Sequence, residues 1–292
     1  MNLSLTPLHP LFAAEVSGVD LREAISDQVF RAVEAALDRY AVLVFRAQLL
    51  STAQQISFSS LFGPLESAFG SMRKTEDSRL GQKPLASRFE TSASTDAWRR
   101  MQLGNQFWHT DSSYKRVPGK ISFLCAHELP PEGGQTEFAD LRAAYDSLDG
   151  PMRSRIEGLV AEHSIFHSRQ LVGFTDFSDE ERSTYPPMPR PVVRLHPGSM
   201  RRSLYLASHA SHIVGLPVEE GRALLTRLTD FATQRKYVYV HHWQLHDLLV
   251  WDNRCTMHRG RPYDDIRYRR DMRRTTVADT VSVPHQERSA QS

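Results

Sequence analysis

The N-terminal region shows a helical hydrophobic pattern, then a strand-like one, then a second helix. Five apolar residues fall on one helical face: Val29, Phe30, Val33, Leu37 and Tyr40. The unbroken apolar run 41–45 follows them and predicts a buried strand. Ser51 and Gln54 have the spacing of a capping box, and Gly63-Pro64 ends the second helix.

Strand-like and helical patterns recur over the rest of the chain. Apolar or alternating runs predict strands at residues 121–126, 192–196, 204–207, 237–242 and 248–251. Helices are predicted near residues 140–147, 151–163 and 217–233. Because strands and helices are interspersed and no linker divides them, we expect one β-rich mixed α/β domain over residues 1–283.

Two segments, 67–104 and 174–191, lack periodicity. The first is polar, and the second carries four prolines. Long irregular segments in a compact domain are usually functional or disordered, so we expect both to be mobile lid loops. The polar tail 284–292 is expected to be disordered.

Composition narrows the class of protein. Cys125 and Cys255 form no CxxC pair, which argues against a disulfide framework and against a thiolate zinc site. The formal net charge of +2 gives no global field that would recruit nucleic acid or an anionic membrane. The N-terminus lacks a secretory pattern, and no run of eighteen apolar residues occurs. We therefore expect a globular cytoplasmic protein.

His109 and Asp111, in the segment FWHTDSSY, are candidate metal ligands. Residues i and i+2 of a strand point to the same side, so both could reach one ion. His258, in WDNRCTMHRG, could complete a facial triad, which leaves the open positions that non-haem Fe(II) oxygenases need. With 13 His and 18 Asp in 292 residues, chance alone predicts about 0.8 His-x-Asp triplets, so the triplet needs further support.

Two other groups of histidines could in principle bind a metal. The densest group is His241, His242 and His246. It lacks a partner motif, so we interpret it as core or surface. His163 and His167 have i, i+4 spacing, but no glutamate completes an HExxH arrangement, so we interpret them as structural.

Arginines crowd the segment RGRPYDDIRYRRDMRRTT that follows His258. A solvated basic face and a nucleic-acid patch are the alternatives. The segment runs into a predicted strand and follows the candidate iron motif, which argues against a nucleic-acid binder. A buried arginine needs an anionic partner, and a dicarboxylate ligand would suit the guanidinium fork.

These segments, together with GGQTEFADLRAAYDSL at residues 133–148, resemble the taurine dioxygenase and aryloxyacetate dioxygenase family. The similarity covers nearly the whole chain and is greatest to the 2,4-dichlorophenoxyacetate dioxygenases. The resemblance implies a double-stranded β-helix (jelly roll) core with flanking helices and lid loops, and Fe(II) held by His109, Asp111 and His258.

The resemblance also implies roles in binding the cosubstrate and the substrate. Arg270 would hold the distal carboxylate of 2-oxoglutarate with help from Thr136, although counting from His258 selects Arg269 instead. Arg274 would sit near the acidic group of the substrate. Two further positions would line the substrate cavity: Asn105 and His196.

The implied activity is Fe(II)- and 2-oxoglutarate-dependent hydroxylation by O2 of a small acidic substrate. An aryloxyacetate would be cleaved to a phenol and glyoxylate, with succinate and CO2 released. An alkylsulfonate or sulfate-ester substrate remains an alternative, and so does a non-catalytic jelly-roll binding protein. No nucleic-acid or membrane partner is expected, while self-association into a homo-oligomer is compatible with the sequence.

Overall fold

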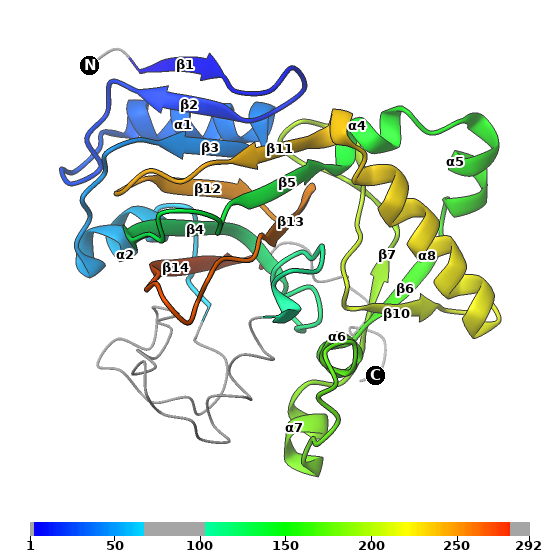
Figure 1. The fold of residues 1–292 in the computed structure, drawn as a ribbon. Coiled ribbons are helices and arrows are strands. Elements are labelled where there is room, and N and C mark those ends of the chain that lie inside the picture. The colour runs from blue at the N-terminus through cyan, green and yellow to red at the C-terminus, as the bar shows by residue number, and fades with distance from the viewer. Residues whose placement is uncertain (1–2, 67–102, 281–292) are drawn as a thin grey trace, which may run out of the picture.

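The computed structural model describes residues 3–66 and 103–280. Within these ranges the fold is a β-rich mixture of strands and helices, as predicted (Figure 1). The expected lid segment 67–104 lies almost entirely outside the described residues, and so does the expected tail 284–292. In the described part of the chain, no helix has the length and apolar character needed to cross a bilayer.

A six-stranded sheet forms one wall of the molecule, in the order β1-β2-β3-β12-β4-β14. Its strands are β1 (Ser4–Pro7), β2 (Ala14–Ser17), β3 (Val42–Phe45), β12 (Leu248–Asp252), β4 (Gly119–Glu128) and β14 (Asp271–Ala278). Each residue of β12 is buried, and Val250 lies between Leu43 of β3 and Phe123 of β4. The apolar runs 41–45, 121–126 and 248–251, each predicted to be a strand, thus lie side by side in one sheet.

The two faces of this sheet serve different cores because side chains alternate along a strand. On one face, Phe45, Phe123 and Val250 pack with α1 (Asp27–Tyr40) and α2 (Thr52–Ser60). The predicted capping box of Ser51 and Gln54 begins α2, which confirms that reading of the sequence.

The other face of the six-stranded sheet covers a second, three-stranded sheet. This sheet has the order β11 (Val238–His241), β5 (Thr136–Asp140) and β13 (Thr256–Gly260). Phe138 of β5 packs against Trp251 of β12 with ring centroids 5.4 Å apart, and Leu249 joins the same cluster. Ser122, Leu124, Arg274 and Thr276 follow the register of Trp251 and so share its face.

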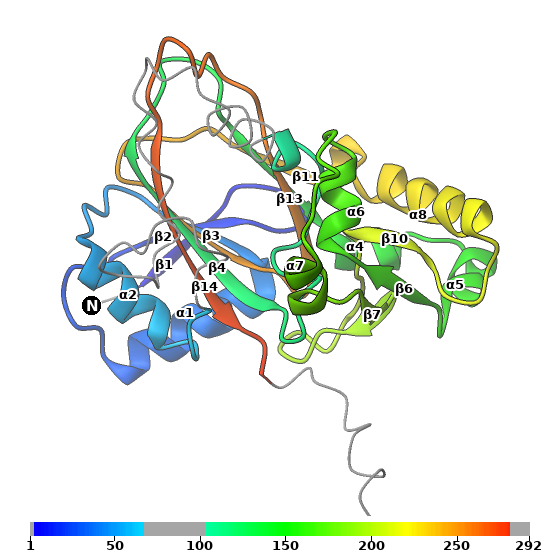
Figure 2. The same ribbon diagram turned by 90° about the horizontal axis from the view of Figure 1, so that it is seen from below.

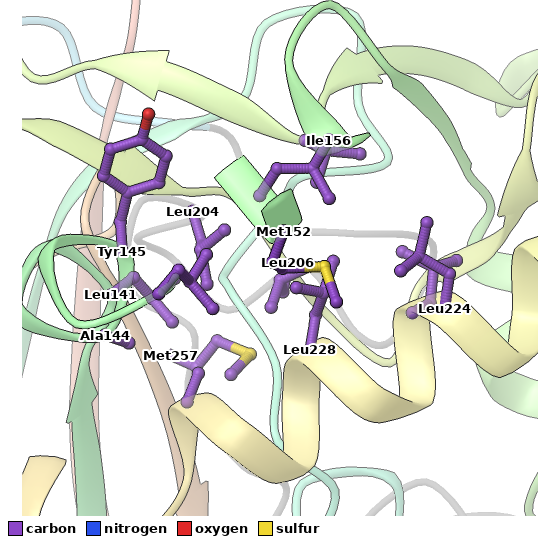
Figure 3. Close-up of a cluster of buried hydrophobic side chains, with 14 of the residues drawn as sticks. Leu141, Ala144, Tyr145, Met152, Ile156, Leu204, Leu206, Leu224, Leu228 and Met257 are labelled. Atoms are coloured by element: carbon purple, nitrogen blue, oxygen red, sulfur yellow. The ribbon is translucent and has the colours of Figure 1, made fainter. Parts of the chain in front are cut away.

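A third group of elements packs beside the two sheets (Figure 2). It contains the sheet β10 (Ala210–Ile213), β6 (Val160–His163) and β7 (Met188–Pro191), the hairpin β8 (Val193–Leu195) and β9 (Arg202–Leu204), a short 3-10 helix (Arg235–Tyr237), and helices α4 (Leu141–Asp146), α5 (Gly150–Ile156), α6 (Ile165–Gln170), α7 (Asp179–Thr184) and α8 (Val218–Ala232). Its core includes Leu141, Met152, Leu206, Leu228 and Met257 (Figure 3). Met257 belongs to β13, so the next residue, His258, points to the opposite side.

The predicted bounds of one helix and one strand were wrong in part. The helix predicted over 151–163 ends at Ile156, because Gly158 adopts φ +74° and the chain continues as β6. The strand expected at 204–207 lies instead at Arg202–Leu204.

The segment 174–191 is not irregular throughout, since it contains α7 and β7. Ser178 and Glu181 form a capping box that begins α7, a signal already present in the sequence. The prolines Pro189 and Pro191 are tolerated in β7 because it is an edge strand, which among the described residues has a neighbour on one side only. A lid function for this segment stays a prediction.

We predict that Gly221→Ala lowers stability although alanine favours helices. A Cβ at Gly221 in α8 would stand 2.7 Å from the backbone nitrogen of Ile213 in β10, so the helix would have to move away. The expected loss is about 1–3 kcal/mol in the free energy of unfolding, measured by urea denaturation. Gly150→Ala in α5 is the matched control, because no atom lies within 4 Å of the added Cβ. Equal midpoints for Gly221→Ala and the unmutated protein would contradict this packing argument.

Candidate metal centre and flanking arginines

A single antiparallel bridge brings His109 and His258 together. The backbone nitrogen of His109 donates to the carbonyl of His258 at 3.0 Å, and that of His258 donates to the carbonyl of His109 at 2.8 Å. His258 belongs to β13, whereas His109 and Asp111 lie in a bridge and the turn after it. The expectation that the His-x-Asp triplet lies on a regular strand is therefore wrong.

The three side chains nevertheless converge, and each is less than 9% exposed. One ligand atom from each residue lies within 4.8 Å of the others. The Asp111 carboxylate is 3.9 Å from Nε2 of His109 and 3.8 Å from Nε2 of His258. The imidazole centroids are 4.2 Å apart. The predicted triad is thus assembled around one point.

Neighbouring groups fix the orientation of these ligands. Nδ1 of His109 lies 2.8 Å from the carbonyl of Phe107, so it donates there and leaves Nε2 as the acceptor facing Asp111. The Ser122 hydroxyl donates to Asp111 Oδ2 at 2.7 Å. Asn253 accepts from the Asp111 backbone nitrogen at 3.2 Å and donates to Ser122 at 2.9 Å. Metal sites depend on such supporting bonds.

Protonation states also suit a cation. Burial lowers the pKa of His109 below its ordinary value and lowers that of His258 to about 3, so both imidazoles are neutral near pH 7. Burial alone would raise the pKa of Asp111, but Arg274 and the two imidazoles outweigh it, so the net pKa is lowered and the carboxylate is ionised. Two neutral imidazoles and one carboxylate are the donor set of non-haem Fe(II) sites.

Arg274 forms an ion pair with the triad itself. Its Nη1 donates to Asp111 Oδ1 at 2.9 Å, and about 45% of its side chain remains exposed. β14 pairs with β4 so that Arg274 is opposite Leu124, on the face directed toward the second sheet. The arginine expected beside the substrate's acidic group is therefore at the site, in contact with Asp111.

Arg270 and Arg269 have different surroundings. Arg270 donates from Nη2 to the carbonyl of Gly134 at 3.1 Å, while its buried Nε has no partner among the described residues. Burial lowers the pKa of Arg270 to about 10, and the rings of Trp243 and Tyr263 lie beside its guanidinium. Arg269 instead is half-exposed and faces Glu128 at 3.8 Å. Only Arg270 of this pair points inward.

Thr136 lies in the same neighbourhood as Arg270. Trp243, whose ring flanks Arg270, donates its indole N–H to the Thr136 hydroxyl at 3.0 Å. Thr136 and Phe138 are two residues apart on β5, and Phe138 is opposite His258 on β13. All three therefore point to the same side of the three-stranded sheet.

His196 lies in surroundings that the resemblance did not indicate, and a substrate contact stays a prediction. Its side chain is fully buried, and both ring nitrogens have protein partners, Ser199 Oγ at 2.8 Å and Asp252 Oδ2 at 3.0 Å. His196, Asp252 and Cys255 form a second cluster of potential metal ligands. Arg254 donates from two nitrogens to the two carboxylate oxygens of Asp252. We therefore interpret this cluster as structural, built on the Arg254–Asp252 ion pair.

Asn105 lies beside the site through its backbone. Its carbonyl accepts from the backbone nitrogen of Gly260, two residues after His258, at 2.8 Å, and its side chain is exposed. This position is compatible with the edge of a substrate cavity, and a substrate contact stays a prediction.

The remaining histidine groups have structural surroundings, as interpreted from the sequence. His241 is fully buried and hydrogen bonds to Tyr239 and Asp247, each at 3.0 Å. His163 is fully buried and bonds to Ser113 at 2.9 Å.

Several residues near the triad escaped sequence reasoning. They are Ser122, Trp243, Asn253, His209, Tyr114 and Arg169. Asn253 stands within WDNRCTMHRG and could have been suspected there. Ser122 and Arg169 carry no sequence signal, since their proximity to the triad depends on strand register and on the placement of α6.

Comparison with known proteins identifies the family. Residues 4–276 match the model described as "Taurine catabolism dioxygenase TauD, TfdA family", and the chain belongs to this family. The chain is 47% identical over 289 residues to the alpha-ketoglutarate-dependent 2,4-dichlorophenoxyacetate dioxygenase of Cupriavidus pinatubonensis, with 97% of this chain and all of the relative covered.

Two further likenesses agree with the first. The (S)-phenoxypropionate/alpha-ketoglutarate-dioxygenase of Sphingobium herbicidovorans is 39% identical, with 89% of this chain and 90% of the relative covered. The crystal structure of AAD-2 in complex with Mn(II) and N-oxalylglycine superposes with a TM-score of 0.82 at 44% identity, covering 96% of this chain and 98% of that one. The predicted class is confirmed: the protein is an alpha-ketoglutarate-dependent dioxygenase, which uses Fe(II), 2-oxoglutarate and O2.

We predict that Ser122→Ala weakens metal binding, because the Asp111 carboxylate loses the bond that orients it. The expected rise in Kd for Mn(II), measured by calorimetry on metal-free protein, is about 10-fold or more. Ser203→Ala is the control, since the Ser203 hydroxyl is also buried but bonds only to the adjacent carbonyl of Leu204. An unchanged Kd for Ser122→Ala would show that Ser122 does not orient Asp111.

Proposed function

We propose that this enzyme hydroxylates an aryloxyacetate, with 2,4-dichlorophenoxyacetate as the model substrate. The observation that carries the proposal is a His-Asp-His triad beside arginines able to receive two acidic ligands. The 47% identity to a 2,4-dichlorophenoxyacetate dioxygenase over nearly the whole chain supports this substrate class.

His109, Asp111 and His258 would hold Fe(II) as a facial triad. When bound, Fe(II) with 2-oxoglutarate and O2 supplies the oxidising power, and succinate and CO2 are released. Ser122 and Asn253 keep the Asp111 carboxylate in place. The protein's contribution at this point is geometry, because hydrogen bonds orient His109 and Asp111 before the metal and the cosubstrate arrive.

Arg270 and Thr136 would bind the distal carboxylate of 2-oxoglutarate. The unpartnered Nε of Arg270 is a donor that a carboxylate could satisfy together with Nη2 in a bidentate pair. Trp243 flanks both side chains and excludes water from that pair. Desolvation strengthens the attraction between guanidinium and carboxylate, so the cosubstrate would be firmly oriented.

Arg274 and Asn105 would contact the primary substrate. Arg274 uses Nη1 for Asp111, which leaves further N–H groups for an acidic group of the substrate. Hydroxylation of the carbon beside the ether oxygen gives a hemiacetal. This collapses to a phenol and glyoxylate, so one aryloxyacetate, one 2-oxoglutarate and one O2 give phenol, glyoxylate, succinate and CO2.

The same proposal extends to the fold. The facing sheets described above support a double-stranded β-helix core with the triad at one mouth. Residues 1–283 would form a single domain that acts on a small molecule, without nucleic acid. An alkylsulfonate or sulfate ester is the second candidate substrate, because an arginine accepts a sulfonate as it does a carboxylate.

Turnover with a substrate panel tests the proposed activity. We expect purified enzyme with Fe(II), ascorbate and 2-oxoglutarate to release phenol and succinate in a 1:1 ratio from 2,4-dichlorophenoxyacetate. Taurine and hexyl sulfate, presented to the same enzyme, should stimulate much less succinate release. Preferential turnover of a sulfonate or sulfate ester would replace the aryloxyacetate proposal with the second candidate.

Exchange of the two adjacent arginines tests the cosubstrate pocket. Arg270→Met should raise KM for 2-oxoglutarate by about 100-fold, since a desolvated bidentate pair is lost. Arg269→Met, the matched control at the half-exposed position, should leave KM within about twofold, as expected for an exposed ion pair. The reverse order would assign the pocket to Arg269.

A further inference from the structure

Arg169 brings a positive charge close to the triad and has no acidic partner within residues 3–66 and 103–280. It is the penultimate residue of α6 and is half-buried. In the same described ranges its guanidinium makes no side-chain hydrogen bond or ion pair. One guanidinium nitrogen, Nη1, lies 3.8 Å from the position that a Cβ on Gly104 would take. The guanidinium therefore reaches from α6 to the segment that leads into His109.

Contacts of the neighbouring residue place this part of α6 on the His109 side of the metal centre. The preceding residue, Ser168, bonds to Nδ1 of His209 at 2.8 Å. The His209 ring is 6.3 Å from the His109 ring and 4.8 Å from that of Tyr114. The positive charge of Arg169 contributes to the lowered pKa of His109, in keeping with a guanidinium close to the triad. Arg274 also lowers the pKa of His109, and in addition it donates directly to Asp111.

Within residues 3–66 and 103–280, the charge of Arg169 is incompletely compensated by its surroundings. Burial lowers the pKa of its guanidinium, and the Tyr114 phenol is the one group that counters this shift. Partly buried cations in proteins are normally paired, because the loss of hydration is otherwise unrewarded. An anionic ligand placed here would supply the missing partner.

Three arginines therefore surround the triad in different states. Among the described residues, the Nε–H of Arg270 has no acceptor and is available to 2-oxoglutarate. Arg274 forms an ion pair with Asp111. Arg169 alone of the three has neither an acid nor a backbone acceptor among the described residues. A dioxygenase of this class acting on an acid binds two anions, and the second needs a cation that is not already neutralised.

We propose that Arg169 binds the carboxylate of the aryloxyacetate, opposite Arg274, and selects acidic over neutral aryl ethers. This inference rests on the proposed function and adds a residue that determines specificity. The two guanidinium groups hold the carboxylate from two sides, and Arg169 supplies the net charge that the Arg274–Asp111 pair lacks.

The experiment measures binding without turnover. Protein loaded with Mn(II) and N-oxalylglycine is titrated by calorimetry with 2,4-dichlorophenoxyacetate and with the neutral 2-(2,4-dichlorophenoxy)ethanol. Arg169→Gln should raise Kd for the acid by about 10- to 100-fold, the effect of a hydrogen-bonded charge, and leave Kd for the alcohol unchanged. Kd for the acid in Arg169→Lys should lie between those of the wild type and Arg169→Gln, because lysine keeps the charge but lacks the guanidinium fork.

Arg227→Gln on the exposed side of α8 removes the same charge and controls for net charge. An unchanged Kd for N-oxalylglycine in each variant shows that the site is intact. A Kd for the acid within twofold of wild type in Arg169→Gln would overturn the proposal, and so would a loss confined to N-oxalylglycine. Absence of acid binding in the wild type would instead overturn the proposed substrate class, and this inference with it.

Discussion

Two backbone hydrogen bonds between His109 and His258 determine where the chemistry of this enzyme can take place. They join the segment before β4 to the middle of β13. β13 is itself fixed by pairing with β5 and by Met257, which is buried in the core beside α4 and α8. Once His258 points away from that core, the bridge places His109 next to it. The turn after His109 then brings Asp111 within reach of both imidazoles.

The charges of the triad and of the nearby arginines suit the binding of a cation and of acidic ligands. Asp111 is ionised beside two neutral imidazoles, so the triad offers one negative charge to a divalent cation. Arginines enter from separate elements: Arg274 from β14, Arg270 from the segment before it, and Arg169 from α6. Arg270 and Arg169 are incompletely paired in the described structure, which suits a site that receives two acids.

The sequence predicted most of the metal centre but less of its surroundings. The triad was found because its three residues lie in recognisable segments, and Arg270 was preferred over Arg269 from the RRDMRRTT pattern. The surroundings of His196 could not be predicted, since a match in position does not reveal that Asp252 and Ser199 bond to its ring nitrogens. Ser122 and Arg169 could not be predicted, because their roles depend on the pairing of β4 with β14 and on the placement of α6. The edge strand β7 was missed because its prolines suggested a loop.

The most direct test of the central claim is the visible spectrum of the anaerobic complex. Fe(II) and 2-oxoglutarate are added without O2 to wild-type protein, to His109→Ala and to His241→Ala, which alters a buried histidine outside the triad. The account predicts a weak charge-transfer band of the Fe(II)–2-oxoglutarate chelate in wild type and His241→Ala, and its loss in His109→Ala. A band that survives in His109→Ala, or no band in metal-replete wild type, would contradict the assignment of the triad.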